Sequence, residues 1–192
     1  MRLPEGTIEA KTRSVTQNVI KTLLQTAGMW GFFLGVMPIA IASFERLLLS
    51  WQLPAVPAEI CWGGFALFGS IGVYSGMLFA VHGHGTPLPL DTATRFIVLG
   101  PYRWVRNPMA IAGITQGIWI GLLLRSPAVL AYCLVGGCAW HFLARPWEER
   151  DLARRFGGPY THYRDQVRNW IPCLRPYEKL FGSEEPDRRA LA

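Results

Sequence analysis

Four long stretches without a charged residue constrain this chain more than any other feature. They are residues 22–44, 60–81, 107–124 and 126–144, which contain 23, 22, 18 and 19 residues. An α-helix needs about 20 apolar residues to cross the hydrocarbon core of a bilayer. A soluble chain of 192 residues with four such stretches would have too little polar surface to cover its core. The stretches therefore predict an all-α integral membrane protein with four transmembrane helices.

The composition agrees with a membrane protein. Hydrophobic residues make up 51% of the chain and charged residues only 17%, against the roughly 25% usual in soluble domains. We expect a single membrane domain over 1–192. The first apolar stretch begins about twenty residues into the chain and is too long for a signal peptide, so it is interpreted as a span and residues 1–21 as a cytoplasmic lead-in.

The distribution of Lys and Arg predicts the orientation of the spans. Four lie before the first span, one in the 44–59 connection, three in 82–106, one in the third connection and ten from Arg145 onward. Cytoplasmic connections carry the excess of Lys and Arg, so both termini are expected in the cytoplasm. Eight acidic residues are interspersed with the ten tail cations, which argues against a nucleic-acid partner.

The segment GPYRWVRNP, residues 100–108, places two arginines directly before the third apolar stretch. Pro108 is a favoured first-turn residue, and Asn107 falls where an N-cap residue belongs. Free amides at a helix N-terminus, flanked by Arg103 and Arg106, predict a receptor for an anionic group. The alternative is positive-inside anchoring with the two aromatic residues of the segment at the interface, and the spacing alone favours that alternative.

A second polar segment, residues 144–172, follows the last span directly. Its acidic residues begin a helical stretch and two arginines end it, which complements the helix dipole. Gly157-Gly158-Pro159 predicts the end of that helix, and aromatic residues at helical spacing then predict a second, amphipathic helix on the membrane surface. The alternative is a solvated helix with ordinary salt bridges, but a carboxylate pair leaving a span without a partner would be costly.

Scattered histidines and cysteines give no spacing typical of a metal site, so none is predicted. The Gly- and Pro-rich connection before Arg95 argues against continuous helix there, and residues 95–99 are short enough to run extended.

The two polar segments together resemble a known family. GPYRWVRNPMAIAG, followed about forty residues later by EERDLARRFGGPYTHYRDQVRNWIP, resembles the isoprenylcysteine carboxyl methyltransferase family, which belongs with the membrane phospholipid methyltransferases. The pattern of that family is G-x-Y-x-x-x-R-H-P-x-Y-x-G, an uncharged helical hairpin, and then E-E-x-x-L-x-x-x-F-G-x-x-Y-x-x-Y. The resemblance covers roughly residues 82–172, so we expect a methyltransferase-like core there, with the first two spans in 22–81 and a polar tail in 173–192.

The resemblance implies S-adenosyl-L-methionine as the cofactor, in a pocket that the cytoplasmic loop and the C-terminal amphipathic helices form. It implies that Glu148 contacts the cofactor and that Arg145, one position later than the family spacing, positions the methyl acceptor. Glu149 is the available base if the acceptor is an amine. The other expected cofactor-binding residues are Thr94, Arg95, Phe96, Ile97, Tyr102, Arg106, Asn107, Pro108, Met109 and Ala110.

The chain departs from the family pattern at three positions. Asn107 stands in place of the motif histidine, Ala110 in place of the tyrosine, and Gly113 is displaced by one, with Ala112 at the motif position. The amide of Asn107 still donates a hydrogen bond but, unlike a histidine, it does not titrate. The absence of the tyrosine removes a ring that would pack on the cofactor. These departures leave cofactor binding as the expectation and the methyl acceptor open.

The expected function is methyl transfer, in which the protein mainly has to align donor and acceptor. The first choice of acceptor is the carboxylate of a prenylcysteine-like or other lipophilic molecule, which would arrive laterally from the bilayer. Phospholipid N-methylation is the second choice and a small thiol or amine the third. A non-catalytic scaffold that retains the fold is the alternative from another class, and cofactor binding separates it from an enzyme. A transporter is disfavoured because no span carries a charged residue in its middle.

Overall fold

The computed structural model describes residues 15–83 and 95–178, and every regular element within them is helical. Thr94, one of the expected cofactor-binding residues, lies outside the described residues, as do 1–14 of the lead-in and 179–192 of the tail. The elements are α1 (Val15–Trp30), η1 (Gly31–Val36), α2 (Met37–Leu48), α3 (Ala58–His82), η2 (Gly100–Arg103), α4 (Pro108–Leu123), α5 (Pro127–Ala139), η3 (Trp140–Ala144) and α6 (Arg145–Gln166).

The first three elements form one continuous helix of 34 residues, Val15–Leu48. It begins seven residues before the apolar stretch that predicted it. Asn18 and Thr22, four residues apart on one face, are almost fully buried, so this face packs against the bundle although it is polar. Pro38 is the second residue after the π-helical turn η1, which ends at Val36. Because proline lacks an N–H and crowds the preceding turn, a widened turn at this point lets the helix continue past it.

Glycines allow α3 and α4 to approach closely. A β-carbon at Gly72 would lie 3.2 Å from the β-carbon of Ala112 and 2.9 Å from the ring of Trp30. One turn further, Gly76 faces the side chain of Met109. Small residues at such an interface let helix backbones come together inside a bilayer, where packing rather than the hydrophobic effect drives association.

The last helix, Pro127–Gln166, has 40 residues and runs from α5 through the π-helical turn η3 into α6. Only the part up to Ala144 is apolar, and α6 carries the charged residues. Gly157 interrupts α6 with φ 54° and ψ −130°. The predicted stop at Gly157-Gly158-Pro159 is therefore confirmed, and helix resumes after it as predicted. The second helix is shorter than expected because it ends at Gln166, before Trp170.

Glu45, at the end of α2, holds the other end of the bundle together. Its buried carboxylate accepts hydrogen bonds from the Ser126 hydroxyl and the Ala128 N–H, 3.0 Å away. Ser126 in turn caps α5 by accepting from the N–H of Val129. The N-terminus of α5 is thus tied to the end of α2.

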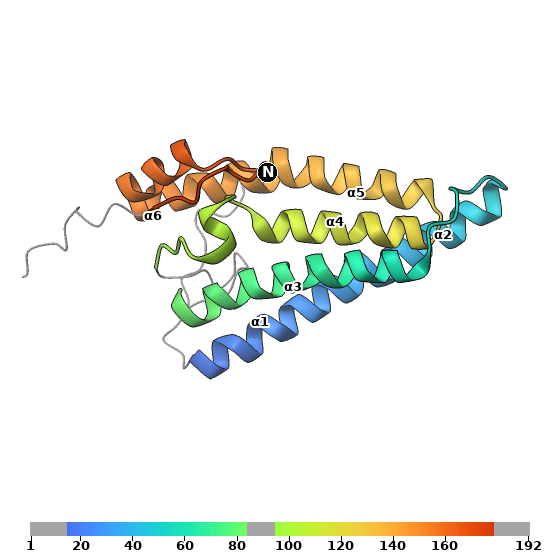
Figure 1. Ribbon diagram of the computed structural model, residues 1–192, viewed down its shortest axis with the longest axis horizontal. Helices are drawn as coiled ribbons and strands as arrows, with labels where there is room; N and C mark the ends of the chain where they lie inside the picture. The colour runs from blue at the N-terminus through green and yellow to red at the C-terminus, as the bar shows by residue number, and fades with distance from the viewer. Residues whose placement is uncertain (1–14, 84–94, 179–192) are drawn as a thin grey trace, which may run out of the picture.

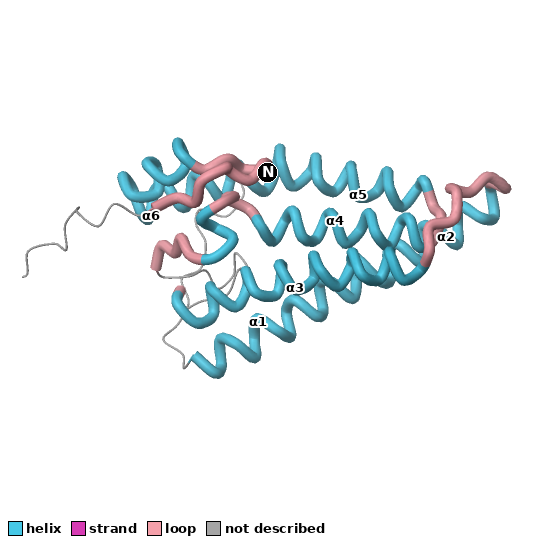
Figure 2. The backbone as a smooth tube through the Cα atoms, in the orientation of Figure 1, coloured by secondary structure: helices cyan, strands magenta, loops and turns pink. Residues whose placement is uncertain are grey.

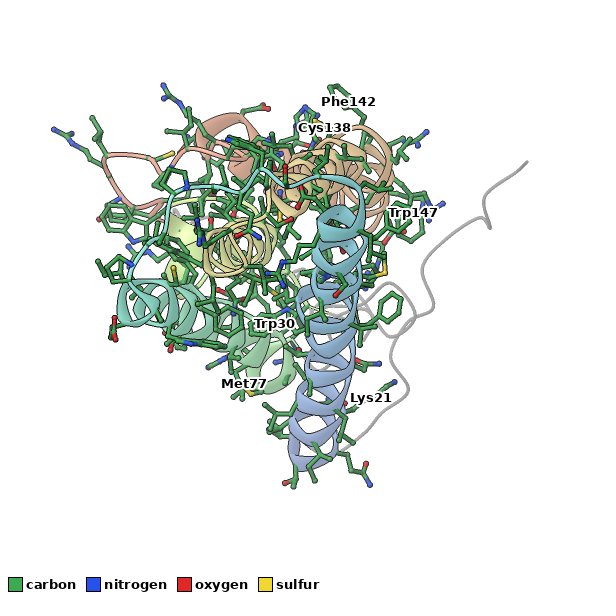
Figure 3. The ribbon with its side chains drawn as sticks, turned by 90° about the vertical axis from the view of Figure 1, so that its right-hand side faces the viewer. Lys21, Trp30, Met77, Cys138, Phe142 and Trp147 are labelled. Atoms are coloured by element: carbon green, nitrogen blue, oxygen red, sulfur yellow. The ribbon has the colours of Figure 1, made fainter. Side chains whose placement is uncertain are left out.

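Within residues 15–83 and 95–178, three helices are long and apolar enough to cross a membrane: Val15–Leu48, Ala58–His82 and Pro127–Gln166. The 16 residues of α4 make a shorter apolar helix, which lies between α3 and α5 (Figure 1). Figure 3, a view along the helices, shows Phe142 at the outer edge of the bundle and Trp30 inside it. Phe142 is 70% exposed, as expected of a lipid-facing side chain. The fold is that of an integral membrane protein with three to four spanning helices.

Candidate functional site

The polar segments gather at one end of the bundle. Helix α6, η2 and the loop segments on either side of them lie together at the end where α1 begins (Figure 1). Figure 2 shows the loop that follows α6 running back along it toward the start of α4. The two segments that the sequence singled out, 100–108 and 144–172, are therefore neighbours in space.

Backbone hydrogen bonds join the chain around η2 to the segment after α6. The N–H of Arg106 donates to the carbonyl of Arg168 at 3.0 Å, and the N–H of Cys173 donates to the carbonyl of Trp104 at 2.8 Å. The N–H of Tyr177 donates to the carbonyl of Arg103 at 2.7 Å. These bonds hold residues 168–177 against residues 103–106, which lead into α4.

Aromatic rings fix the 95–99 segment on α6. The ring of Phe96 contacts those of Phe156, Tyr160 and Tyr163 at centroid distances of 5.4–5.8 Å. The hydroxyl of Tyr163 donates to the carbonyl of Tyr102 at 2.7 Å. Burial raises the pKa of Tyr160 to about 12 and that of Tyr163 well above its ordinary value. Both rings therefore stay neutral phenols at physiological pH.

An ion-pair cluster connects the start of α6 to the start of α4. Arg106 Nη1 lies 2.7 Å from Glu149 Oε1, and Arg145 Nη1 lies 3.7 Å from the same oxygen. Side-chain exposure of the three residues is between 13% and 24%, so the pairs are only partly screened by solvent. The cluster gives Glu149 two cationic partners, which suits a residue that positions groups better than one that accepts a proton.

Glu148, next to this cluster, lies in a different environment. Burial, with repulsion from Glu149 and Asp151, raises the pKa of its carboxyl to about 7. Among the described residues its carboxylate has no hydrogen-bond or ion-pair partner. Burial, with Glu148 as a second cause, also raises the pKa of Tyr102. A lone acidic group of this kind close to a buried aromatic residue is typical of a ligand-binding position.

The N-terminus of α4 begins as predicted but is not capped as predicted. Asn107 is the N-cap residue by position and Pro108 is the first helical residue, yet the side chain of Asn107 makes no capping bond. Its Nδ2 instead donates to Oδ1 of Asn169. The first turn of α4 therefore has no side-chain cap from Asn107, since this amide is engaged across the site.

The structure places Met109 and Ala110, both in the predicted cofactor-binding run 107–110, in different surroundings. Met109 packs against Gly76 of α3, which also lies close to Thr22 of α1. Ala110 lines a groove of about 220 Å³ between α1, η1, α4 and α5. Of the other predicted residues, Ile97 and Tyr102 are buried and Arg95 is exposed.

The groove is almost entirely apolar and lies in the bundle between spanning helices. Ala110, Gly113 and Gly117 form its α4 side, and Gly136 and Gly137 its α5 side. The ring of a tyrosine at position 110 would project beside this line of glycines, so the Ala110 departure keeps one end of the groove open. A larger apolar hollow of about 450 Å³ lies along α2 beside Glu45, at the other end of the bundle from the charged cluster.

Sequence reasoning missed Asn169 as a site residue. The residue is 8% exposed, its Oδ1 accepts from Asn107, and its Nδ2 has no hydrogen-bond partner in the described part of the chain. The contact joins residues 62 positions apart, and no local pattern predicts it.

Comparison with known proteins gives a family for this chain. The sequence model of the phospholipid methyltransferase family, described as "Phospholipid methyltransferase", matches residues 61–158. The match runs from α3 to the break in α6 and so includes the start of α4 and the carboxylate pair. No curated protein matches the chain. Since the match covers half of the chain, the protein belongs to the phospholipid methyltransferase family and is a membrane methyltransferase.

Proposed function

We propose that this protein transfers the methyl group of S-adenosyl-L-methionine to the carboxylate of a prenylcysteine-like or other lipophilic acceptor. The transfer takes place at the cytoplasmic ends of four spanning helices, with both termini on that side. The observation that carries the proposal is the pair of neighbouring carboxylates, in which Glu149 is held by two arginines and Glu148 has no partner in the described chain.

The residues present fit this cofactor. Its amino-acid end carries a carboxylate, for which Arg106 offers a buried Nε–H without a partner. Its ribose hydroxyls or its amine are donors, for which Glu148 is the available acceptor. Tyr102, a buried ring packed edge-on against Phe79 at 5.2 Å, offers an aromatic face for a cation. Trp104 is 42% exposed and fits this role less well.

When bound, the cofactor supplies an electrophilic methyl group on a sulfonium. In-line transfer to an acceptor oxygen would leave the electron pair of the carbon–sulfur bond on the sulfur. A carboxylate nucleophile has no proton to lose, so the chain has only to align it. Arg145 is suited to align the acceptor carboxylate. Its guanidinium lies 3.7 Å from Glu149, a long ion pair that leaves it available to a second carboxylate.

The acceptor is proposed to be lipophilic because the groove beside Ala110 is apolar and lies between spanning helices. An acyl or prenyl chain in the groove would place its polar end near the start of α4. A soluble acceptor would gain nothing from this surface.

The family match favours a second candidate, N-methylation of a phospholipid amine. An amine has to lose a proton when it is methylated, and Glu148, with its pKa near 7, is the group suited to accept one. The two candidates differ in their product, because a methyl ester is hydrolysed by mild base and a methylamine is not.

The test is calorimetric binding of S-adenosyl-L-methionine to the full chain in detergent. We expect micromolar affinity, and we expect Arg106→Ala and Glu148→Gln each to weaken it about tenfold, which corresponds to about 1.4 kcal/mol. Arg103→Ala is the matched control, because its Nε donates to the carbonyl of Tyr177 and not into the charged cluster. Equal losses from the two arginine variants would contradict the assigned site, and no binding to folded protein in detergent and in lipid would favour the scaffold alternative.

The acceptor is then tested with radiolabelled cofactor and vesicles that contain either a farnesylcysteine analogue or phosphatidylethanolamine. Base-labile label in the farnesylcysteine fraction supports carboxyl methylation. Base-stable label in the phospholipid fraction would replace it with the second candidate.

A further inference from the structure

An amide pair lies at the centre of the site in place of the family histidine. Nδ2 of Asn107 donates to Oδ1 of Asn169. This bond fixes the orientation of the Asn169 amide, because the oxygen is engaged and the nitrogen is left over. The chain thus replaces one ring by two side chains from segments far apart in the sequence.

Within the described residues, two buried N–H groups at this amide pair have no hydrogen-bond partner. One is Nδ2 of Asn169, on a residue 8% exposed, and the other is Nε of Arg106, whose side chain is 13% exposed. Buried polar groups are nearly always hydrogen-bonded, so each exception calls for an explanation. Two exceptions of the same kind in one place indicate a missing acceptor.

The two donors belong to paired segments. The backbone N–H of Arg106 donates to the carbonyl of Arg168, and the next residue along each segment, Asn107 and Asn169, joins the amide pair. The first turn of α4 lies next to them and has no side-chain cap from Asn107. A guanidinium N–H, an amide N–H and the positive end of a helix together match a carboxylate, which accepts several N–H bonds at once.

We propose that Asn169 is a further cofactor-binding residue, which donates its Nδ2–H to the carboxylate at the amino-acid end of S-adenosyl-L-methionine together with Nε–H of Arg106. Asn107 acts as a positioning residue that holds the Asn169 amide with its nitrogen toward the ligand. The inference rests on the proposed cofactor of this site and adds to it a residue outside the family match, which ends at residue 158.

The experiment measures calorimetric binding of two ligands to the full chain in detergent: S-adenosyl-L-methionine and its decarboxylated form, which lacks only the carboxylate. The wild-type protein is expected to bind the complete cofactor at least tenfold more tightly. Asn169→Ala removes the donor and Asn169→Asp replaces it with a negative charge. Both should weaken binding of the complete cofactor about tenfold or more, and change binding of the decarboxylated form less than twofold.

Gln166→Ala is the matched control, because it removes an exposed amide from the same part of the chain. It should leave both affinities unchanged. Asn107→Leu, which frees the Asn169 amide to rotate, should weaken only the complete cofactor, and by less than Asn169→Ala does.

The outcomes separate this inference from the proposed function. If the wild-type protein binds both ligands and Asn169→Ala binds the complete cofactor as tightly, the role of Asn169 is overturned and the proposed function stands. Equal losses for both ligands would assign Asn169 a structural role only and would also overturn the inference. If folded wild-type protein binds neither ligand, the proposed function fails and this inference fails with it.

Discussion

Glu148 is the residue whose environment departs most from that of an ordinary carboxylate. Its folded-state pKa of about 7 lies above the 4.5 of an unperturbed glutamate. A raised pKa of this kind favours folding below about pH 4.5, and that contribution is lost as the pH rises through 7. In the ligand-free protein near neutral pH, the group is therefore about half protonated. A ligand that needs the carboxylate has to bind the ionised fraction.

This titration predicts a pH dependence of cofactor binding. The ionised fraction of a group with a pKa near 7 rises about tenfold between pH 6 and pH 8, so the affinity should rise by up to the same factor. Calorimetry at pH 6, 7 and 8 measures it, and Glu148→Gln should remove that part of the increase. Glu59→Gln, an exposed glutamate at the start of α3, is the control and should behave as wild type. An unchanged pH profile in Glu148→Gln would contradict the assigned role.

Asn107 shows what a single residue does and does not reveal in the sequence. Its place before Pro108 predicts the start of α4, and α4 starts there. The direction of its side chain is decided by Asn169, which reaches it from 62 residues away. Capping preferences describe only local competition for backbone amides, so they do not foresee a stronger partner brought in by the fold.

Among the elements, α6 depends on one backbone conformation. Gly157 has φ 54° and ψ −130°, a region open to glycine and strained for other residues. Apart from the chain neighbours and the backbone of α6 itself, no described atom lies within 4 Å of a β-carbon built on Gly157 or on Gly158, and of these two glycines only Gly157 has a positive φ. Gly157→Ala should therefore lower the free energy of unfolding by about 1–3 kcal/mol through backbone strain alone.

Thermal unfolding in detergent measures this effect, with Gly158→Ala as the matched control. The Tm of Gly157→Ala should fall by several degrees, whereas Gly158→Ala should keep or slightly raise it, since alanine favours helix. Equal Tm values for the two variants would show that the turn at Gly157 tolerates a side chain.

The elements were largely predictable because their signals are local. Windows without charge predicted the cores of the long helices, and Gly157-Gly158-Pro159 predicted the break in α6. The first helix begins earlier in the chain than predicted. The prediction relied on apolar stretches, whereas Asn18 and Thr22 are polar and yet face the bundle. Helix α4 has 16 residues, two fewer than the uncharged stretch 107–124, because Asn107 and Leu124 at the ends of that stretch belong to the flanking turns.

At the scale of the molecule, the path of the chain places the 49–57 connection and the end of α6 at opposite ends of the bundle (Figure 1). A cysteine-free variant, with all four native cysteines changed to alanine, provides the background for a topology test. In it, Gln52→Cys and Gln166→Cys each place a thiol at an exposed position. With the termini in the cytoplasm, a membrane-impermeant maleimide should label only Gln52→Cys in intact cells and both variants after permeabilisation. Labelling of Gln166→Cys in intact cells would reverse the proposed orientation.

The candidate site is a property of the whole molecule, and the sequence predicted it only in part. The resemblance to a family indicated both polar segments, and the structure brings 95–110 and 145–149 together. The role of residues 168–177 was missed. Residues 168–172 lay within the resemblance, but no residue of this segment was predicted in the site, because its bonds to residues 103–107 span more than 60 positions. Hydrogen bonds between residues so far apart in the sequence leave no periodic pattern by which they could be predicted.

Because the helix continues from α5 into α6, the thickness of the bilayer determines how far Glu148 and Glu149 stand from the membrane surface. Glu148 stands 21 residues after Pro127 on this rod, which corresponds to roughly 32 Å of helix, while the hydrocarbon core measures about 30 Å. If the bonds of Ser126 and Ala128 to Glu45 fix the far end of this helix at one membrane boundary, the acidic pair would lie at the level where lipid headgroups begin. The lipophilic acceptor proposed above would then be methylated without leaving its leaflet, and a thicker membrane would submerge the site.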